Sequence, residues 1–101
     1  FGGLGTGQAL KETGKADDII AVTFDSSDEL INYINDGTLK GLIIQDPWGM
    51  GNMGVKAAFD ASQNGKVLAP FVDTGATLVT KANINDAAID AKLNPSLDCK
   101  P

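Results

Sequence analysis

Two polar residues, Asp25 and Gln45, each follow an apolar run and precede a segment of helical character. In open parallel sheets, ligands bind beyond the carboxyl ends of the strands, where such residues converge. A carboxylate accepts hydrogen bonds from two hydroxyls at once, and an amide both donates and accepts. The pair therefore suits a polyhydroxylated neutral ligand. The alternative is that Asp25 caps the next helix and Gln45 satisfies backbone groups.

Trp48, the only tryptophan, follows Pro47 in a predicted turn between a strand and a helix. A tryptophan at such a position is more often a packing residue than a ligand platform. In a sugar-binding context, however, an aromatic face can stack on the apolar face of a pyranose. Trp48 is therefore a candidate for ligand stacking.

The segment Gly3-Leu4-Gly5-Thr6-Gly7 has glycines in front of a predicted helix, a pattern that can cradle phosphate. Its spacing is not that of a dinucleotide-binding fingerprint, and no strand precedes it in this sequence. We therefore expect a tight turn with close helix packing.

The segment Phe71-Val72-Asp73-Thr74-Gly75-Ala76 resembles the active-site signature of retroviral-type aspartic proteases. Those enzymes are homodimers of about this chain length, in which two carboxylates share a proton. In that family the motif lies in the first third of an all-β chain, whereas here it lies in the last third. A turn leaving a strand is the favoured interpretation, and an aspartic protease is kept as a minor alternative.

The composition argues against several classes of function. The net charge is −5 and the cations are all lysine, which disfavours nucleic acid and anionic membrane surfaces as partners. Histidine is absent, which removes the commonest general base and metal ligand. The single cysteine, Cys99, cannot form an internal disulfide or a thiolate metal site alone. We expect no enzymatic activity, no metal and no cofactor.

Helical and strand patterns alternate along the chain. We expect helices over 5–13, 28–36, 49–64 and 85–93, the last of them capped by Asn85. We expect strands over 18–24, 42–44 and 77–80 and an extended run over 67–72. A tail is expected from Pro95. This alternation predicts an α/β fold with a three-layer, mostly parallel, Rossmann-like sheet covered by helices on both sides. No strand precedes the first helix, which we interpret as a truncated edge.

Several short segments of the sequence resemble those of the periplasmic sugar-binding proteins of the ribose type. They are Val22-Thr23-Phe24-Asp25, Asn35-Asp36-Gly37, Gln45 with Pro47, Gly54-Val55-Lys56, and Thr77-Leu78-Val79-Thr80-Lys81. The similarity runs from about Gly5 to Lys81, and lac-repressor-type regulators share the same fold. The resemblance implies the two-lobed periplasmic binding protein type I fold.

The resemblance also implies roles for particular residues. Asp25 and Gln45 match family positions that hydrogen-bond sugar hydroxyls. The family chain crosses between its lobes at hinge segments, which here match Gln45-Asp46-Pro47 and Asp73-Thr74-Gly75. Residues 1–45 then belong to the C-terminal lobe, 46–73 to the N-terminal lobe, and 74–101 to the return crossing and the C-terminal lobe. A further family ligand would lie upstream of Phe1, so we expect a C-terminal fragment.

The expected function is binding of a sugar or sugar-like molecule between two lobes and its delivery to an ABC-type importer. The alternative is the ligand-binding domain of a sugar-responsive transcription regulator. The implied partners are the sugar, a membrane ABC permease, and either the missing N-terminal part of the protein or a second copy of the chain. The implied location is periplasmic or extracytoplasmic in a bacterium, with or without a lipid anchor.

Overall fold

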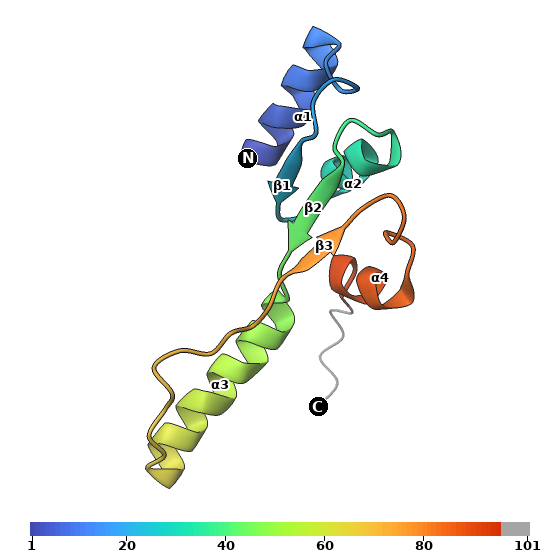
Figure 1. Ribbon diagram of the computed structural model, residues 1–101. Coiled ribbons are helices and arrows are strands. Elements are labelled where there is room, and N and C mark those ends of the chain that lie inside the picture. Colours follow the sequence, from blue (N-terminus) through green and yellow to red (C-terminus); the bar gives the residue numbers. More distant parts are fainter. Residues whose placement is uncertain (96–101) are drawn as a thin grey trace. The chain divides into compact units, whose positions relative to one another are not determined.

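The computed structural model describes residues 1–95 of the 101-residue chain (Figure 1). Its elements are α1 (Gly2–Thr13), β1 (Val22–Phe24), α2 (Asp28–Asn35), β2 (Gly41–Ile44), α3 (Pro47–Asn64), β3 (Thr77–Val79) and α4 (Ala87–Leu93). The α/β fold is thereby confirmed. The chain divides into two compact units, the first formed by Phe1–Ile44 with the chain from Thr77, the second by Gln45–Ala76.

The first unit contains a three-stranded mixed sheet in the order β1-β2-β3. β1 runs parallel to β2, with Phe24 opposite Ile43. β3 returns antiparallel to β2, with Leu42 opposite Val79. Because successive side chains of a strand point to opposite faces, this register places Leu42 and Val79 on one face and Ile43 on the other.

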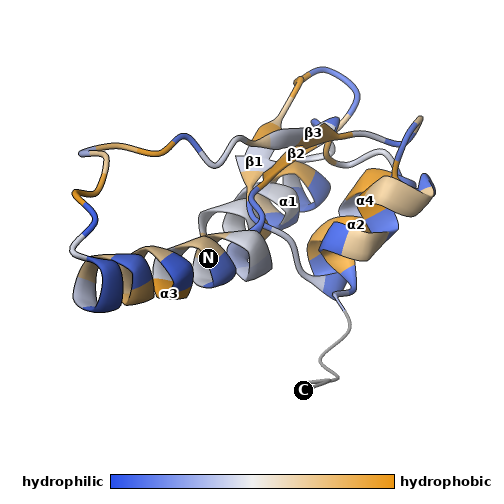
Figure 2. Cartoon of the chain, turned by 90° about the horizontal axis from the view of Figure 1, so that it is seen from below, coloured by the Kyte–Doolittle hydropathy of each residue, from blue (hydrophilic) through white to orange (hydrophobic). Residues whose placement is uncertain are grey.

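The core lies on the face of the sheet that carries Leu42 and Val79, both of which are fully buried. Figure 2 shows α1, α2 and α4 on the same side of the sheet. The buried cluster joins them to it and consists of Leu10, Ala21, Leu30, Tyr33, Ile34, Leu39, Leu42, Ile44, Val79, Ile84 and Ile89.

The opposite face of the sheet is not covered within the described part of this unit. Phe24 is 61% exposed and Leu78 is 50% exposed, although both are large apolar residues. Within the described part of this unit, the helices predicted for both faces are present on one face only. The other face is an apolar sheet surface, formed by Val22, Phe24 and Leu78, without a packing partner in the described part of this unit.

α2 forms as its sequence predicts. The Ser27 hydroxyl accepts a hydrogen bond from the Leu30 N–H at 3.2 Å, and Asp28 and Glu29 lie in the first turn, where the helix dipole favours negative charge. Leu30 is buried in the core. The helix ends at Asn35 with Asp36 as its C-cap, and Gly37 follows with φ of 84°, a left-handed conformation that glycine adopts without steric cost.

The glycine-rich segment 3–7 lies inside α1, so the prediction of a tight turn there was wrong. The expectation of close packing is borne out. A Cβ atom on Gly7 would clash with the ring of Tyr33 in α2. A Cβ atom on Gly3 would lie 3.0 Å from Leu30 Cδ2. The absence of side chains at these positions lets α1 approach α2 and β1.

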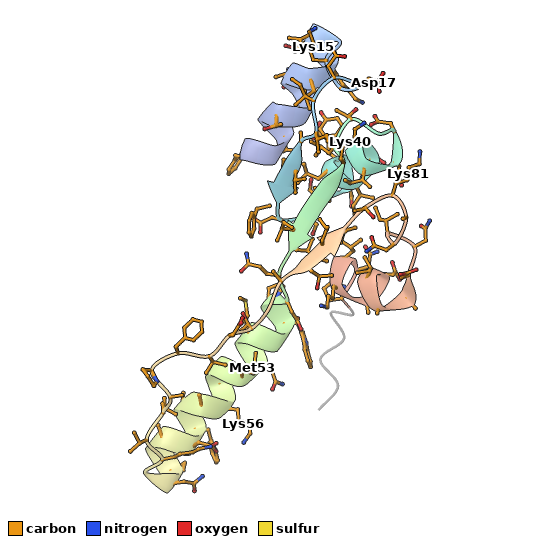
Figure 3. All side chains as sticks on the ribbon, in the orientation of Figure 1. Lys15, Asp17, Lys40, Met53, Lys56 and Lys81 are labelled. Atoms are coloured by element: carbon orange, nitrogen blue, oxygen red, sulfur yellow. The ribbon has the colours of Figure 1, made fainter. Side chains whose placement is uncertain are left out.

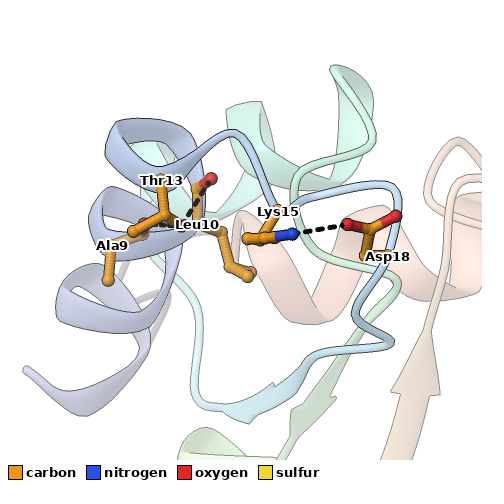
Figure 4. Close-up of polar contacts among 5 residues, drawn as sticks. All are labelled: Ala9, Leu10, Thr13, Lys15 and Asp18. Atoms are coloured by element: carbon orange, nitrogen blue, oxygen red, sulfur yellow. Dashed lines mark hydrogen bonds and ion pairs between the residues drawn. The ribbon is translucent and has the colours of Figure 1, made fainter.

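The strand predicted over 18–24 is shorter than expected, because a turn occupies its first part. The Ile19 N–H donates to the Lys15 carbonyl at 3.1 Å, and Lys15 Nζ lies 3.1 Å from Asp18 Oδ2 (Figure 4). The same view shows the end of α1, where the Thr13 hydroxyl donates to the Ala9 carbonyl at 2.7 Å. Pairing with β2 begins only at Val22.

The extended run predicted over 67–72 forms no paired strand, because the second unit provides no neighbouring strand for it among the described residues. One further local prediction was wrong. Asn85 does not cap the last helix, since the N-cap of α4 is Asp86. The strands predicted over 42–44 and 77–80 are confirmed as β2 and β3. Cys99 and the tail beyond Pro95 lie outside the described residues.

Candidate functional site

Asp25 stands directly after β1 with an uncommon backbone conformation. Its φ is 67°, and it is the only non-glycine residue with positive φ in the described chain. Its N–H donates to the Ile43 carbonyl at 2.9 Å, which extends the β1–β2 ladder by one residue. A left-handed conformation costs a residue with a Cβ atom about 1–2 kcal/mol, although aspartate tolerates it better than most. Such outliers concentrate at functional sites, where the surrounding structure holds them.

The helix-capping alternative for Asp25 is wrong. Ser27 is the N-cap of α2, with extended backbone and its hydroxyl on the Leu30 N–H. The N-cap of α3 is Asp46, whose Oδ1 atom accepts a hydrogen bond from the Gly49 N–H at 2.8 Å. Both caps are therefore supplied by other residues than Asp25 and Gln45.

Gln45 occupies the equivalent position on the neighbouring strand. It follows Ile44, the last residue of β2, just as Asp25 follows Phe24, the last residue of β1. β1 and β2 are parallel, so their carboxyl ends meet at the same edge of the sheet. Both residues are exposed. The structure thus gives them the backbone positions that the sequence predicted, and their role toward a ligand stays a prediction.

Trp48 lies in the first turn of α3 and is 65% exposed. Within the second unit it lines an open groove of about 660 Å³, together with Pro47, Gly51, Asn52, Val55, Lys56 and Phe59. These residues recur at intervals of three and four along α3, the spacing of one helix face. Lys56 projects from this helix (Figure 3). Neither Asp25 nor Gln45 is among the lining residues.

The groove was not predicted, although its signal was present in the sequence. The spacing of Trp48, Val55 and Phe59 places them on one side of an α-helix, and all three are exposed. α3 has no buried residue within the described chain.

The boundaries between the two units fall between Ile44 and Gln45 and between Ala76 and Thr77. The first predicted hinge segment begins at one boundary, and the second ends at Gly75, one residue before the other boundary. Pro47 occupies the first turn of α3. In the second segment, Asp73 Oδ1 accepts from the Gly75 N–H at 2.8 Å and Gly75 has φ of 71°, so the Asp-Thr-Gly sequence forms a side-chain-closed turn. An α/β chain also departs from the all-β fold of the protease alternative.

The described residues contain no group of three or more His, Cys, Asp or Glu side chains placed to hold a metal ion. Among residues 1–95, no helix is both long enough and apolar enough to cross a membrane.

A family model described as periplasmic binding protein domain matches residues 1–66. Among solved structures, a carbohydrate transporter solute binding protein from Agrobacterium radiobacter, in complex with D-arabinose, is 41% identical with a TM-score of 0.81. An ABC transporter solute binding protein from Agrobacterium vitis with bound D-fucose is 33% identical with a TM-score of 0.78. The aligned parts cover 91% and 90% of this chain.

A third solved structure is an ABC transporter, LacI family transcriptional regulator from Brachyspira murdochii. It is 34% identical over 73% of this chain and 23% of its own, with a TM-score of 0.69. A search of curated proteins gave no match. The chain spans 31% of the length of each of the two Agrobacterium proteins, so it corresponds to less than a third of them.

Proposed function

This chain belongs to the family of periplasmic binding protein domains, and on that premise we propose that it is part of a protein that binds a sugar and delivers it to an ABC-type importer. The backbone of Asp25 carries the proposal. A carboxylate at the end of a parallel strand, in a conformation that most residues avoid, suits a fixed hydrogen-bond acceptor for sugar hydroxyls. Gln45, after the adjacent strand, adds an amide that both donates and accepts.

The sugar is proposed to bind between two lobes that close around it. In this proposal residues 1–45 and 74–101 contribute to one lobe and residues 46–73 to the other. Support comes from the division of the chain into two compact units near Gln45 and Thr77. Gln45-Asp46-Pro47 and Asp73-Thr74-Gly75 would then act as hinges. Contacts made only in the closed form would shift the population of the protein toward closure.

Trp48 is proposed as a second type of contact, an aromatic surface for the apolar face of a pyranose. Its exposure in the first turn of α3 supports this role. Packing within the intact protein is the competing role.

The remainder of the protein is the first proposed partner, and a second copy of this chain is the alternative. The uncovered apolar face at Phe24 and Leu78 supports a partner of either kind, because large apolar surfaces of this sort are normally packed. A membrane permease is the second partner, and the proposed location is periplasmic or extracytoplasmic in a bacterium. The proposal includes no enzymatic activity.

A sugar-responsive transcription regulator is the second candidate function, favoured by the Brachyspira murdochii neighbour. The two candidates share the binding site and differ in what binding causes. A DNA-binding segment in the intact protein would decide for regulation, and stimulation of import by a permease would decide for transport.

The test is a binding assay on the intact protein with a panel of monosaccharides that includes D-arabinose and D-fucose. A sugar that binds the native state raises the melting temperature by mass action, and titration calorimetry then gives its affinity. We expect at least one pentose or hexose to bind saturably. Absence of any saturable response across pentoses, hexoses and polyols would refute the proposal.

A further inference from the structure

The last turn of α3 combines an asparagine with a glycine whose backbone is bent and exposed. Asn64 is the final residue of α3, and Gly65 follows as the C-cap with φ of 62° and ψ of 20°. Both residues are exposed. The chain has other asparagines at 32, 35, 52, 83, 85 and 94, and none of these precedes a glycine.

We propose that Asn64 is a site of spontaneous deamidation, in which the backbone nitrogen of Gly65 displaces the side-chain amide as ammonia. The bond between Gly65 N and Asn64 Cγ forms, and the bond between Cγ and Nδ2 breaks. The amide proton of Gly65 leaves with Nδ2 as ammonia, and the product is a five-membered succinimide. Water then opens this ring at either carbonyl to give an aspartyl or an isoaspartyl residue, so the reaction needs no oxidant or reductant.

Glycine makes this attack accessible because it has no Cβ atom to crowd the nitrogen. Apart from Gly65 and its two chain neighbours, no heavy atom of the described chain lies within 4 Å of the position that a Cβ atom on Gly65 would occupy, so no other residue shields this side of Gly65.

The fold holds the attacking nitrogen in a helix cap, so the last turn must open first. The Gly65 N–H donates a hydrogen bond to the Asp60 carbonyl, and the Lys66 N–H donates to the same carbonyl at 3.3 Å. Opening meets little resistance, because α3 has no buried residue among the described part of the chain. The side-chain support of this turn comes from Asp60 Oδ2, which lies 3.4 Å from Lys56 Nζ and 3.5 Å from Lys66 Nζ.

The product would weaken the turn that produced it. A carboxylate at residue 64 adds a negative charge to the C-terminal end of a helix, where the dipole already disfavours it, and close to Asp60. An isoaspartyl linkage also inserts an extra methylene into the backbone, which breaks the hydrogen-bond register of the cap. Deamidation at Asn64 therefore favours further fraying of α3.

The test is peptide mapping by mass spectrometry after incubation of the 101-residue chain at mildly alkaline pH, folded and in concentrated urea. We expect conversion at Asn64 in both, slower in the folded chain, while Asn52 in the same helix keeps its amide as an internal control. Gly65→Ala should slow the loss in urea, where only the crowding of the nitrogen matters. Asp60→Ala should speed it in the folded chain and leave the rate in urea unchanged.

Each arm decides a separate part of the proposal. Equal retention at Asn64 and Asn52 in urea would overturn the site itself. A Gly65→Ala chain that loses its amide as fast as the parent in urea would overturn attack by the backbone nitrogen. Equal rates in the folded and unfolded parent would overturn the gating by the helix cap.

Discussion

Lys11 Nζ lies 2.6 Å from Asp36 Oδ2, and this ion pair ties the last turn of α1 to the end of α2. The same ammonium lies 4.8 Å from the centroid of the Tyr33 ring, within the range of a cation–π interaction. Asp36 Oδ1 accepts from the Thr38 N–H at 2.9 Å. Partial burial raises the pKa of Asp36, but the hydrogen bonds from Lys11 and Thr38 outweigh it and lower the pKa to about 2.

The stability of the fold should therefore depend on pH through Asp36. A carboxyl whose pKa falls from 3.8 to about 2 on folding stabilises the folded state above its ordinary pKa. That contribution is lost as the pH falls from about 4 toward about 2. Because the Asp36 side chain is 42% exposed, solvent screening limits the contribution to below about 1 kcal/mol.

Replacement of Asp36 by Asn tests this dependence. Urea unfolding of both proteins across the acid range gives the free energy of unfolding at each pH. We expect Asp36→Asn to lower it by less than about 1 kcal/mol near neutrality and to flatten its decline in acid. Lys11→Met should also flatten much of the decline of the free energy of unfolding in acid, because it removes the cation that pairs with Asp36. An unchanged acid slope in both variants would assign the decline to other carboxyls.

Gly7 and Gly5 form a matched pair of glycines in one helix with opposite expectations. At Gly7 a Cβ atom would clash with the Tyr33 ring, so Gly7→Ala should lower the free energy of unfolding by about 1–3 kcal/mol. At Gly5 the added Cβ meets nothing within 4 Å, so Gly5→Ala should raise it by about 0.5–1 kcal/mol through helix propensity. Thermal and urea unfolding measure both. Equal effects would show that α1 does not pack on Tyr33 through Gly7.

Alanine substitutions at Leu42 and Leu78 compare the contributions of the two faces of the sheet to stability. Leu42 is fully buried, so Leu42→Ala should lower the free energy of unfolding by about 2–5 kcal/mol. Leu78 is 50% exposed, and Leu78→Ala should cost less than about 1 kcal/mol in this chain. In the intact protein the cost at Leu78 should rise toward that at Leu42, because the proposed partner covers this face. An equally small cost in both contexts would contradict that coverage.

The strongest elements of the fold were predictable because their signals are local. The α2 helix has its cap at Ser27, its acidic first turn and its glycine stop within a dozen residues, and these agree with its buried face. β2 likewise combines a continuous apolar run with burial on nearly every residue. The positions of Asp25 and Gln45 follow from such local signals, since each needs only the end of a strand to be recognised.

Other features depend on contacts that no local pattern contains. The run from Val67 to Val72 has strand character, but a strand requires a neighbour, and its unit supplies none among the described residues. The prediction of a turn at the glycines of α1 was wrong because the contact that requires Gly7, the Tyr33 ring, lies in another helix. The positive φ of Asp25 occurs between the β1–β2 ladder and the Ser27 cap, a combination that brings in the distant Ile43 carbonyl.

The backbone conformation of Asp25 allows the carboxylate to be removed without adding backbone strain. Alanine would be strained at φ of 67°, whereas glycine adopts this angle freely, so Asp25→Gly separates the loss of the carboxylate from backbone strain. In the intact protein, Asp25→Gly should weaken sugar binding by about 1.5–3 kcal/mol, the range for a hydrogen bond to a charged group. Asp25→Asn keeps a hydrogen-bond acceptor and should lose less affinity than Asp25→Gly.

The control is Asp28→Asn, because Asp28 is an exposed acidic residue three positions along the chain. This variant should keep full affinity, as measured by calorimetry. If Asp25→Gly binds as tightly as the parent protein, then the left-handed conformation serves only the turn between β1 and α2, and the sugar contacts must come from elsewhere.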